Sequence, residues 1–138
     1  MSAACVFCEI LEGRVPAFVV LDEPGHMAFL DIRPLFAGHV LLVPKTHWQT
    51  LPDVPAEAVG PLFLAAQRLV RAVERGLGAE GTFVAMNNRV SQSVPHLHVH
   101  VVPRKKKDGL KGFFWPRSKY PSEEAAIEAR DRIVAALD

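Results

Sequence analysis

The chain has 138 residues, a length that predicts a single domain spanning residues 1–138. Hydrophobic residues make up 49% and charged residues 22%, which excludes a disordered chain, and no apolar run approaches the roughly 18 residues of a membrane helix. The first residues lack the basic and apolar regions of a signal peptide, so we expect a cytoplasmic protein with no membrane partner. In that reducing compartment, the two cysteines are expected to be thiols or metal ligands.

Short apolar stretches bounded by proline and glycine predict five strands. The segment Asp22–Gly25 predicts a hairpin turn between the first two strands. The strands are expected at residues 17–21, 26–32, 39–43, 82–86 and 97–102.

Two helices are predicted, one between the third and fourth strands and one at the C-terminus. The first follows Asp53, and Gly60-Pro61 predicts a kink or two abutting helices within it. Ser122 is expected to cap the second helix. The long helix is expected to end at Gly76 and Gly78, with its apolar stripe at Leu62, Ala66, Leu69, Val73 and Leu77. The element order predicts an α+β fold, a mainly antiparallel five-stranded sheet with the long helix on one face.

Charge is distributed unevenly along the chain. The segment Arg104–Lys119 carries a net charge of +6, and the remainder of the chain carries −5. A basic block of this kind suits a phosphate-rich partner or forms a solvated loop. With Phe113, Phe114 and Trp115 inside it, the segment could also stack bases of a nucleic acid or cover a dimer interface.

Three of the six histidines alternate in one segment, His96-Leu97-His98-Val99-His100. Because alternate residues of a strand share a face, the three imidazoles are expected on one side and the apolar residues on the other, under the long helix. A surface strand would mix several polar residue types at those positions. The pattern therefore indicates either a metal site or nucleophilic and proton-transfer chemistry.

This segment, continued by Val101 and Val102, resembles the defining motif of the histidine-triad (HIT) superfamily of nucleotidyl hydrolases and transferases. Three further segments agree with the family in order along the chain, and a fourth, at the N-terminus, is similar to the family's first residues. The resemblance covers residues 5–104, which leaves 104–138 as a basic and aromatic C-terminal extension. The four segments are Cys5–Ile10, Ala28–Ile32, Gly38–His47 and Gln92–Val94.

The resemblance implies a HIT-like fold and cleavage at the α-phosphate of a nucleotide through a nucleotidyl-histidine intermediate. His98 would be the nucleophile, with its other ring nitrogen donating to a backbone carbonyl. His100 would contact phosphate oxygens or relay a proton, and His39 would contact phosphate. The implied nucleotide-binding residues are Phe7, Ile10, Phe29 and Ile32 around the base, Asp31 on the ribose, and Asn87 or Asn88, Gln92 and Ser93 near the phosphate. The sequence departs from the family in one place, because the loop Asn88–Ser91 has no glycine.

The pair Cys5-x2-Cys8 has the spacing of zinc ligands, and closing a tetrahedral site requires two more. In family members that carry this pair, zinc is held by both cysteines, a histidine after the Pro-Lys segment and the first triad histidine. Those positions are His47 and His96 here. The resemblance thus implies a structural zinc site, and the alternative is two reduced thiols without metal.

The resemblance leaves the substrate open among dinucleoside polyphosphates, nucleoside phosphoramidates and adenylated amines. The run Lys105–Lys107 favours a dinucleoside polyphosphate hydrolase acting on an adenine nucleotide, with adenosine phosphoramidase-type activity or nucleic-acid-end deadenylation as alternatives. A catalytic metalloenzyme using the triad itself would usually add a carboxylate, and the nearest one after the triad is Asp108. The family is commonly homodimeric, so we expect a homodimer. We expect no nucleic-acid partner.

Overall fold

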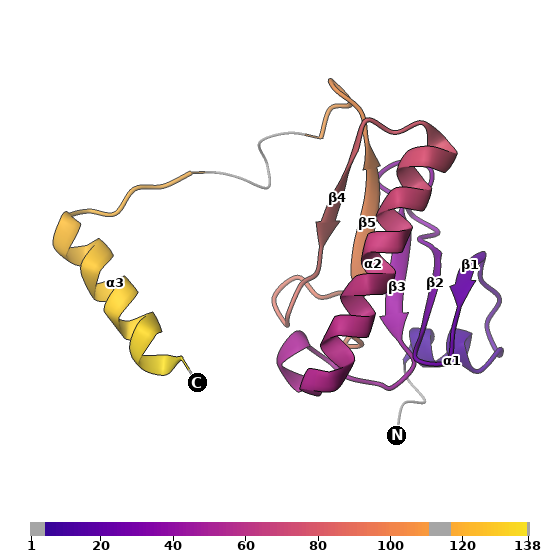
Figure 1. The fold of residues 1–138 in the computed structure, drawn as a ribbon, viewed down its shortest axis with the longest axis horizontal. Helices are drawn as coiled ribbons and strands as arrows, with labels where there is room; N and C mark the ends of the chain where they lie inside the picture. Colours follow the sequence, from indigo (N-terminus) through magenta and orange to yellow (C-terminus); the bar gives the residue numbers. More distant parts are fainter. Residues whose placement is uncertain (1–4, 111–116, 138) are drawn as a thin grey trace. The chain divides into compact units, whose positions relative to one another are not determined.

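The computed structural model describes residues 5–110 and 117–137 (Figure 1). The chain divides into two compact units, Met1–Lys106 and Lys107–Asp138. The first unit contains all five strands, and the second contains the C-terminal helix. The aromatic residues Phe113, Phe114 and Trp115, for which base stacking or a dimer interface was considered, lie outside the described residues.

The first unit is built on one antiparallel sheet in the order β1-β2-β3-β5-β4. Its central strands are almost wholly apolar and buried, which is expected of strands covered on both faces. The α+β fold with a five-stranded antiparallel sheet is confirmed. The strands are β1 (Val19–Asp22), β2 (His26–Leu30), β3 (Val40–Pro44), β4 (Gly81–Ala85) and β5 (Val99–Arg104).

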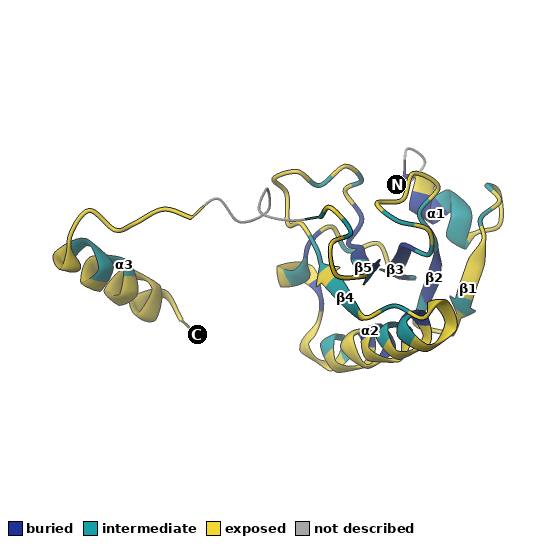
Figure 2. Cartoon of the chain, turned by 90° about the horizontal axis from the view of Figure 1, so that it is seen from above, coloured by how far each residue is buried: buried dark blue, intermediate teal, exposed yellow. Residues whose placement is uncertain are grey.

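Helix α2 (Ala56–Leu77) covers one face of this sheet, as predicted (Figure 2). Of the two alternatives expected at Gly60-Pro61, two abutting helices is wrong, because α2 is a single helix of 22 residues with Pro61 inside it. Pro61 lies in the second turn, so it removes only one helical hydrogen bond, and packing of the apolar stripe outweighs that loss. Gly78 ends the helix in a left-handed conformation with φ 64°, as predicted, whereas Gly76 remains within the helix.

The opposite face of the sheet carries a short helix that the sequence analysis did not predict, α1 (Val6–Leu11). Cys5 caps it, with its Sγ accepting a hydrogen bond from the backbone N–H of Cys8 at 3.4 Å. Figure 2 shows α1 and α2 on opposite sides of the strands. The sheet therefore has a helix-covered face and a second face on which α1 stands.

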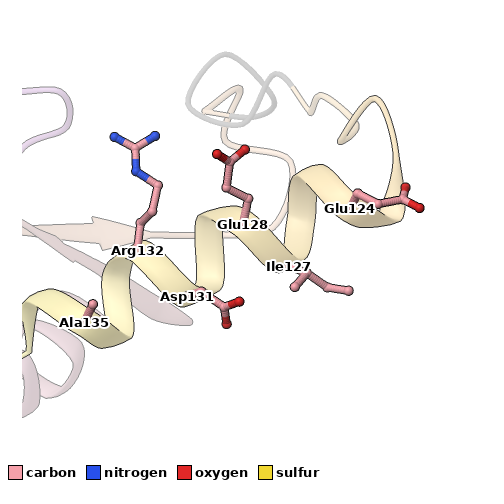
Figure 3. Close-up of a pocket in the computed structure, with 6 residues that line it drawn as sticks. All are labelled: Glu124, Ile127, Glu128, Asp131, Arg132 and Ala135. Carbon is pink, nitrogen blue, oxygen red and sulfur yellow. The ribbon is translucent and has the colours of Figure 1, made fainter.

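The second unit contains α3 (Glu123–Ala136), which Ser122 caps as predicted. Along one side of α3 runs a shallow hollow bounded by acidic, apolar and basic side chains (Figure 3). No histidine, cysteine or serine lines it, so it offers none of the chemistry that the sequence indicates. In the part of the chain that the structure describes, we find no helical segment with the length and hydropathy needed to span a bilayer. The residues that line the hollow are Glu124, Ile127, Glu128, Asp131, Arg132 and Ala135.

Candidate active site and metal cluster

A cleft of about 370 Å³ opens on the face of the sheet that carries α1. His98 and His100 line it from the β5 segment, Asp31 from the end of β2, and Ser93 from the loop before β5. The sheet thus brings together residues that lie far apart in sequence. Apolar walls come from α1, the segment before β1, and strands β2 and β3: Val6, Phe7, Ile10, Val15, Pro16, Ala17, Phe29, Leu30, Ile32 and Leu41.

The triad residues do not form one uniform row on a strand. β5 begins only at Val99, because the backbone at Leu97 donates its N–H to Trp48 O at 2.7 Å instead of to a sheet neighbour. His96 faces the cysteines, whereas His98 and His100 face the cleft with ring centroids 5.0 Å apart. The intervening apolar residues pack under α2, as predicted.

A backbone carbonyl fixes the tautomer of His98. Its Nδ1 lies 2.8 Å from the carbonyl oxygen of His96, and a carbonyl can only accept a hydrogen bond. The neutral imidazole therefore carries its proton on Nδ1 and holds a lone pair on Nε2. Phe7 packs edge-on against the ring at a centroid distance of 5.0 Å, which further restricts the imidazole.

His39 and His100 form a second, oriented pair. The backbone N–H of Leu35 donates to His39 Nδ1 at 3.1 Å, so neutral His39 carries its proton on Nε2. That Nε2–H lies 2.9 Å from His100 Nδ1 and donates to it, which leaves the proton of His100 on its own Nε2. Both proton positions follow from the Leu35 backbone N–H, which can only donate. As a result, His100 presents an N–H group at Nε2 from an imidazole that lines the cleft.

Burial keeps all these imidazoles neutral. Desolvation lowers the pKa of His98, although the His96 carbonyl and the charge of Asp31 act in the opposite direction. Burial also lowers the pKa of His39. For His100, burial and the neighbouring His98 and His39 lower the pKa to about 4. The site therefore holds neutral imidazoles near neutral pH, the state in which nitrogen can act as a nucleophile.

Asp31, His39 and His100 place three potential ligand atoms close together, with Asp31 Oδ2 3.8 Å from His39 Nε2. The tautomer chain argues against a metal there, because the His39 nitrogen that faces the other two atoms carries a proton. One oxygen of Asp31 accepts the Arg33 backbone N–H at 2.9 Å, which orients the carboxylate at the edge of the cleft.

Among the residues predicted to contact the nucleotide, His39, Gln92 and both candidates Asn87 and Asn88 do not line the cleft. The Asn87 side-chain amide donates to Ser91 O at 3.2 Å, and the Gln92 amide spans the loop, donating to Gln49 O and accepting from Arg89 N. The glycine-free loop also places Arg89 and Ser91 at φ 74° and 63°, a region that usually favours glycine. These amides therefore hold the loop that carries Ser93.

A Cys2His2 cluster lies next to the cleft. The Sγ atoms of Cys5 and Cys8 lie 3.5 and 3.6 Å from His96 Nδ1, and His47 Nδ1 lies 3.1 Å from both Cys8 Sγ and His96 Nδ1. Both thiols are free and buried, and burial raises the pKa of the Cys5 thiol. The four residues named from the sequence converge as a group.

The cluster has the geometry that a tetrahedral metal requires. Bonds of about 2.3 Å to sulfur and about 2.0 Å to nitrogen separate the ligand atoms of a tetrahedral site by about 3.3 to 3.8 Å, close to the distances found here. His96 Nε2 lies 2.8 Å from Pro44 O, so this nitrogen carries the proton and Nδ1 directs a lone pair into the cluster. The donor set, two thiols and two imidazoles, can hold a metal ion such as zinc.

The basic residues after β5 lie away from His98. β5 runs from the histidine segment to Arg104, and at about 3.3 Å per residue its far end lies about 20 Å from His98. The Lys106 backbone N–H donates to Glu80 Oε1 at 2.8 Å, beside the start of β4. Lys105 and Lys106 thus follow the end of β5 that lies farthest from His98.

The domain model of the HIT family matches residues 12–107 of the chain. The chain belongs to the HIT family. An adenosine 5′-monophosphoramidase of Saccharomyces cerevisiae is 34% identical over 114 residues, covering 80% of this chain and 69% of that protein. At the level of family and enzyme class, the prediction of a HIT-family nucleotide hydrolase is confirmed.

Solved structures agree with this assignment. A HIT-family protein of Bacillus subtilis superposes with a TM-score of 0.87 at 30% identity, covering 97% of each chain. A zinc-bound histidine-triad protein of Mycobacterium smegmatis superposes with a TM-score of 0.75 at 37% identity, covering 99% of this chain and all of that one. The predicted HIT-like fold is confirmed.

Proposed function

We propose that this protein hydrolyses nucleoside 5′-phosphate derivatives at the α-phosphorus, with His98 as the nucleophile. The observation that carries the proposal is the hydrogen bond from His98 Nδ1–H to the His96 carbonyl oxygen. It leaves the Nε2 lone pair on a neutral, restrained imidazole that lines the cleft.

The reaction proceeds in two displacements. His98 Nε2 attacks the α-phosphorus, the bond to the leaving group breaks, and the leaving group takes up a proton from water. A water molecule then attacks the phosphorus of the nucleotidyl-histidine, the bond between phosphorus and Nε2 breaks, the water gives up a proton to solvent, and the nucleoside monophosphate is released. His100 Nε2–H donates to a phosphoryl oxygen during both steps, and Ser93, on the same cleft, donates to the leaving-group side.

The rest of the cleft binds the nucleoside. Phe7, Ile10, Phe29 and Ile32 supply apolar surface for an adenine base. Asp31 accepts hydrogen bonds from the ribose hydroxyls, with its carboxylate held in place by the Arg33 backbone. His39 supports His100 through their hydrogen bond. Asn87 and Gln92 act through the loop that carries Ser93, as positioning residues in place of the direct contacts predicted from sequence.

We favour a phosphoramidate, with an amine leaving group, over the dinucleoside polyphosphate predicted from sequence. That prediction depended on the lysine run, and Lys105 and Lys106 follow the far end of β5. Similarity to an adenosine 5′-monophosphoramidase supports the same choice. Comparing kcat/KM for adenosine 5′-phosphoramidate, diadenosine triphosphate and diadenosine tetraphosphate tests it. A preference for either dinucleotide would contradict the choice of leaving group.

We propose that Cys5, Cys8, His47 and His96 hold one zinc ion, supported by their spacing and by the zinc-bound relative. Zinc in such a closed four-ligand site stabilises the fold and takes no part in the chemistry. Thiolate ligands persist in a reducing compartment, which supports a cytoplasmic location. Elemental analysis of protein purified without added metal is expected to give about one zinc per chain.

We also propose a homodimer in which a second copy covers β4 and the adjoining part of α2. β4 is an edge strand of the sheet with Val84 exposed, and α2 exposes Phe63 and Leu64. An edge strand offers unpaired backbone groups for pairing, and adjacent exposed apolar side chains are typical of an interface. Light scattering during gel filtration is expected to give twice the chain mass, and Leu64→Lys is expected to lower it.

A further inference from the structure

Helix α1 contributes to two different sites at once. The cysteines at its first turn, Cys5 and Cys8, belong to the Cys2His2 cluster. The side chains between and after them, Phe7 and Ile10, line the cleft. Six residues of one helix therefore connect a metal-ligand cluster with the wall of a ligand site.

The position of α1 depends on these contacts. A helix of six residues has little stability of its own, because nucleation is costly and few hydrogen bonds follow it. Its cap is a thiol acceptor at 3.4 Å, longer than an ordinary hydrogen bond to oxygen. What holds α1 on the sheet is its packing against β2 and β3 and the convergence of its two cysteines with His47 and His96.

Two further sets of contacts connect the cleft with the same cluster. Phe7 packs edge-on against Phe29, His96 and His98, with ring centroids 5.5, 5.9 and 5.0 Å away. His96 places its Nδ1 in the cluster and its carbonyl oxygen 2.8 Å from His98 Nδ1. A shift of α1 or of His96 would therefore move the base-binding wall and the nucleophile together.

We propose that metal occupancy of the Cys2His2 cluster and nucleotide binding in the cleft are positively coupled through α1. This inference rests on the proposed zinc site and nucleotide cleft. A metal ion bound to both cysteines fixes α1 in the position that forms the cleft wall, and a nucleotide packed against Phe7 and Ile10 holds the cysteines in place. By linkage, each ligand raises the affinity for the other by the same factor.

The first experiment measures zinc affinity with and without nucleotide. Loaded protein is equilibrated with a chromogenic zinc chelator, in the presence and absence of saturating adenosine monophosphate. We expect the nucleotide to tighten zinc binding by at least about fivefold, the lower end of ordinary coupling. Zinc bound by the nucleotide's own phosphate also lowers the chelator signal, so the zinc that stays on the protein is measured by elemental analysis after the protein is separated from the small molecules. Equal partition with and without nucleotide would overturn the inference.

The second experiment uses two matched variants, Ile10→Ala and Ile32→Ala. Both remove the same atoms from the cleft wall, but Ile10 lies on α1 and Ile32 on the loop after β2, 80% exposed. Both are expected to weaken nucleotide binding, measured by calorimetry. Only Ile10→Ala is expected to reduce the effect of nucleotide on zinc partition, and an equal reduction in both variants would show that α1 has no special role.

The two levels of proposal fail in different ways. If the purified protein retains no zinc, or if adenosine monophosphate does not bind, the proposed site or function is wrong. If both ligands bind and neither changes the affinity for the other, only the coupling is wrong. The partition experiment starts from loaded, folded protein, so it decides the question even if metal-free protein unfolds.

Discussion

His96 and His98 lie two residues apart, are both buried, and are held in opposite tautomers. Pro44 O fixes the proton of His96 on Nε2, which directs its Nδ1 lone pair at the two cysteines. The carbonyl oxygen of His96 fixes the proton of His98 on Nδ1, which directs its Nε2 lone pair into the cleft. The same residue type is thus prepared for the proposed role of metal ligand at His96 and for the proposed role of nucleophile at His98.

The difference shows that a backbone carbonyl, and not the histidine itself, selects which ring nitrogen carries the lone pair. Both imidazoles have a pKa lowered by burial, so acidity does not distinguish them. What distinguishes them is which ring nitrogen meets a carbonyl oxygen, because that nitrogen must keep the proton. Removing either ring therefore affects a different property of the protein.

The largest effect is expected from His98. His98→Ala is expected to lower kcat by about 10⁴-fold or more, because it removes the attacking nitrogen. His98→Asn keeps much of the shape and is expected to bind nucleotide without turning it over. Rapid-quench mass spectrometry of the wild type is expected to find a nucleoside monophosphate on the peptide that contains His98. An adduct on another residue, or normal turnover by His98→Ala, would refute the assigned mechanism.

Loss of a cluster ligand is expected to lower the stability of the fold more than the rate of the reaction. Cys5→Ser removes one of four ligands, so we expect less than one zinc per chain and a free energy of unfolding lower by about 3 kcal/mol. Elemental analysis and chemical denaturation measure the two quantities. His26→Ala removes a histidine outside the cluster and serves as the control. A variant that keeps its metal and its stability would contradict the ligand assignment.

Many residues of the two histidine sites could be predicted from sequence, because they belong to short motifs. The spacing His96-x-His98 and the pair Cys5-x2-Cys8 named three cluster residues, the family resemblance added His47, and all four converge in space. The resemblance implied the tautomer of His98, whereas that of His96 could not be predicted, since Pro44, like Trp48, reaches the histidine segment only through the fold. The same reason explains why β5 begins at Val99 and not at Leu97.

Helices were harder to predict than the site. α1 is short, and its apolar positions also fit a strand or loop; the i, i+3 spacing of Cys5 and Cys8 is the signal that could have indicated it. The continuity of α2 through Pro61 reflects tertiary packing of Leu62 and Leu69 against the sheet, which local propensity does not contain.

A smaller effect is expected from pH acting on His100. Its pKa is about 4 in the folded protein and 6.5 in its ordinary state, so between these values the unfolded chain binds a proton that the folded chain does not. Stability is therefore lost as pH falls from 6.5 toward 4, by about 2 kcal/mol for this group after allowing for its partial exposure. Urea denaturation at pH 7 and pH 5 measures it. His100→Asn is expected to lose less stability over that interval than the wild type, and an equal loss would contradict a buried neutral His100.

The smallest effect is expected at the far end of β5, which lies about 20 Å from His98. Because screening in physiological salt has a length of about 8 Å, charges at that distance interact weakly with a phosphate in the cleft. Replacing Lys105 and Lys106 by Ala is therefore expected to change kcat/KM by less than about twofold, and equally for adenosine 5′-phosphoramidate and diadenosine tetraphosphate. Assays of both substrates at low and high salt measure this. A selective loss of dinucleotide turnover that disappears at high salt would restore the polyphosphate prediction.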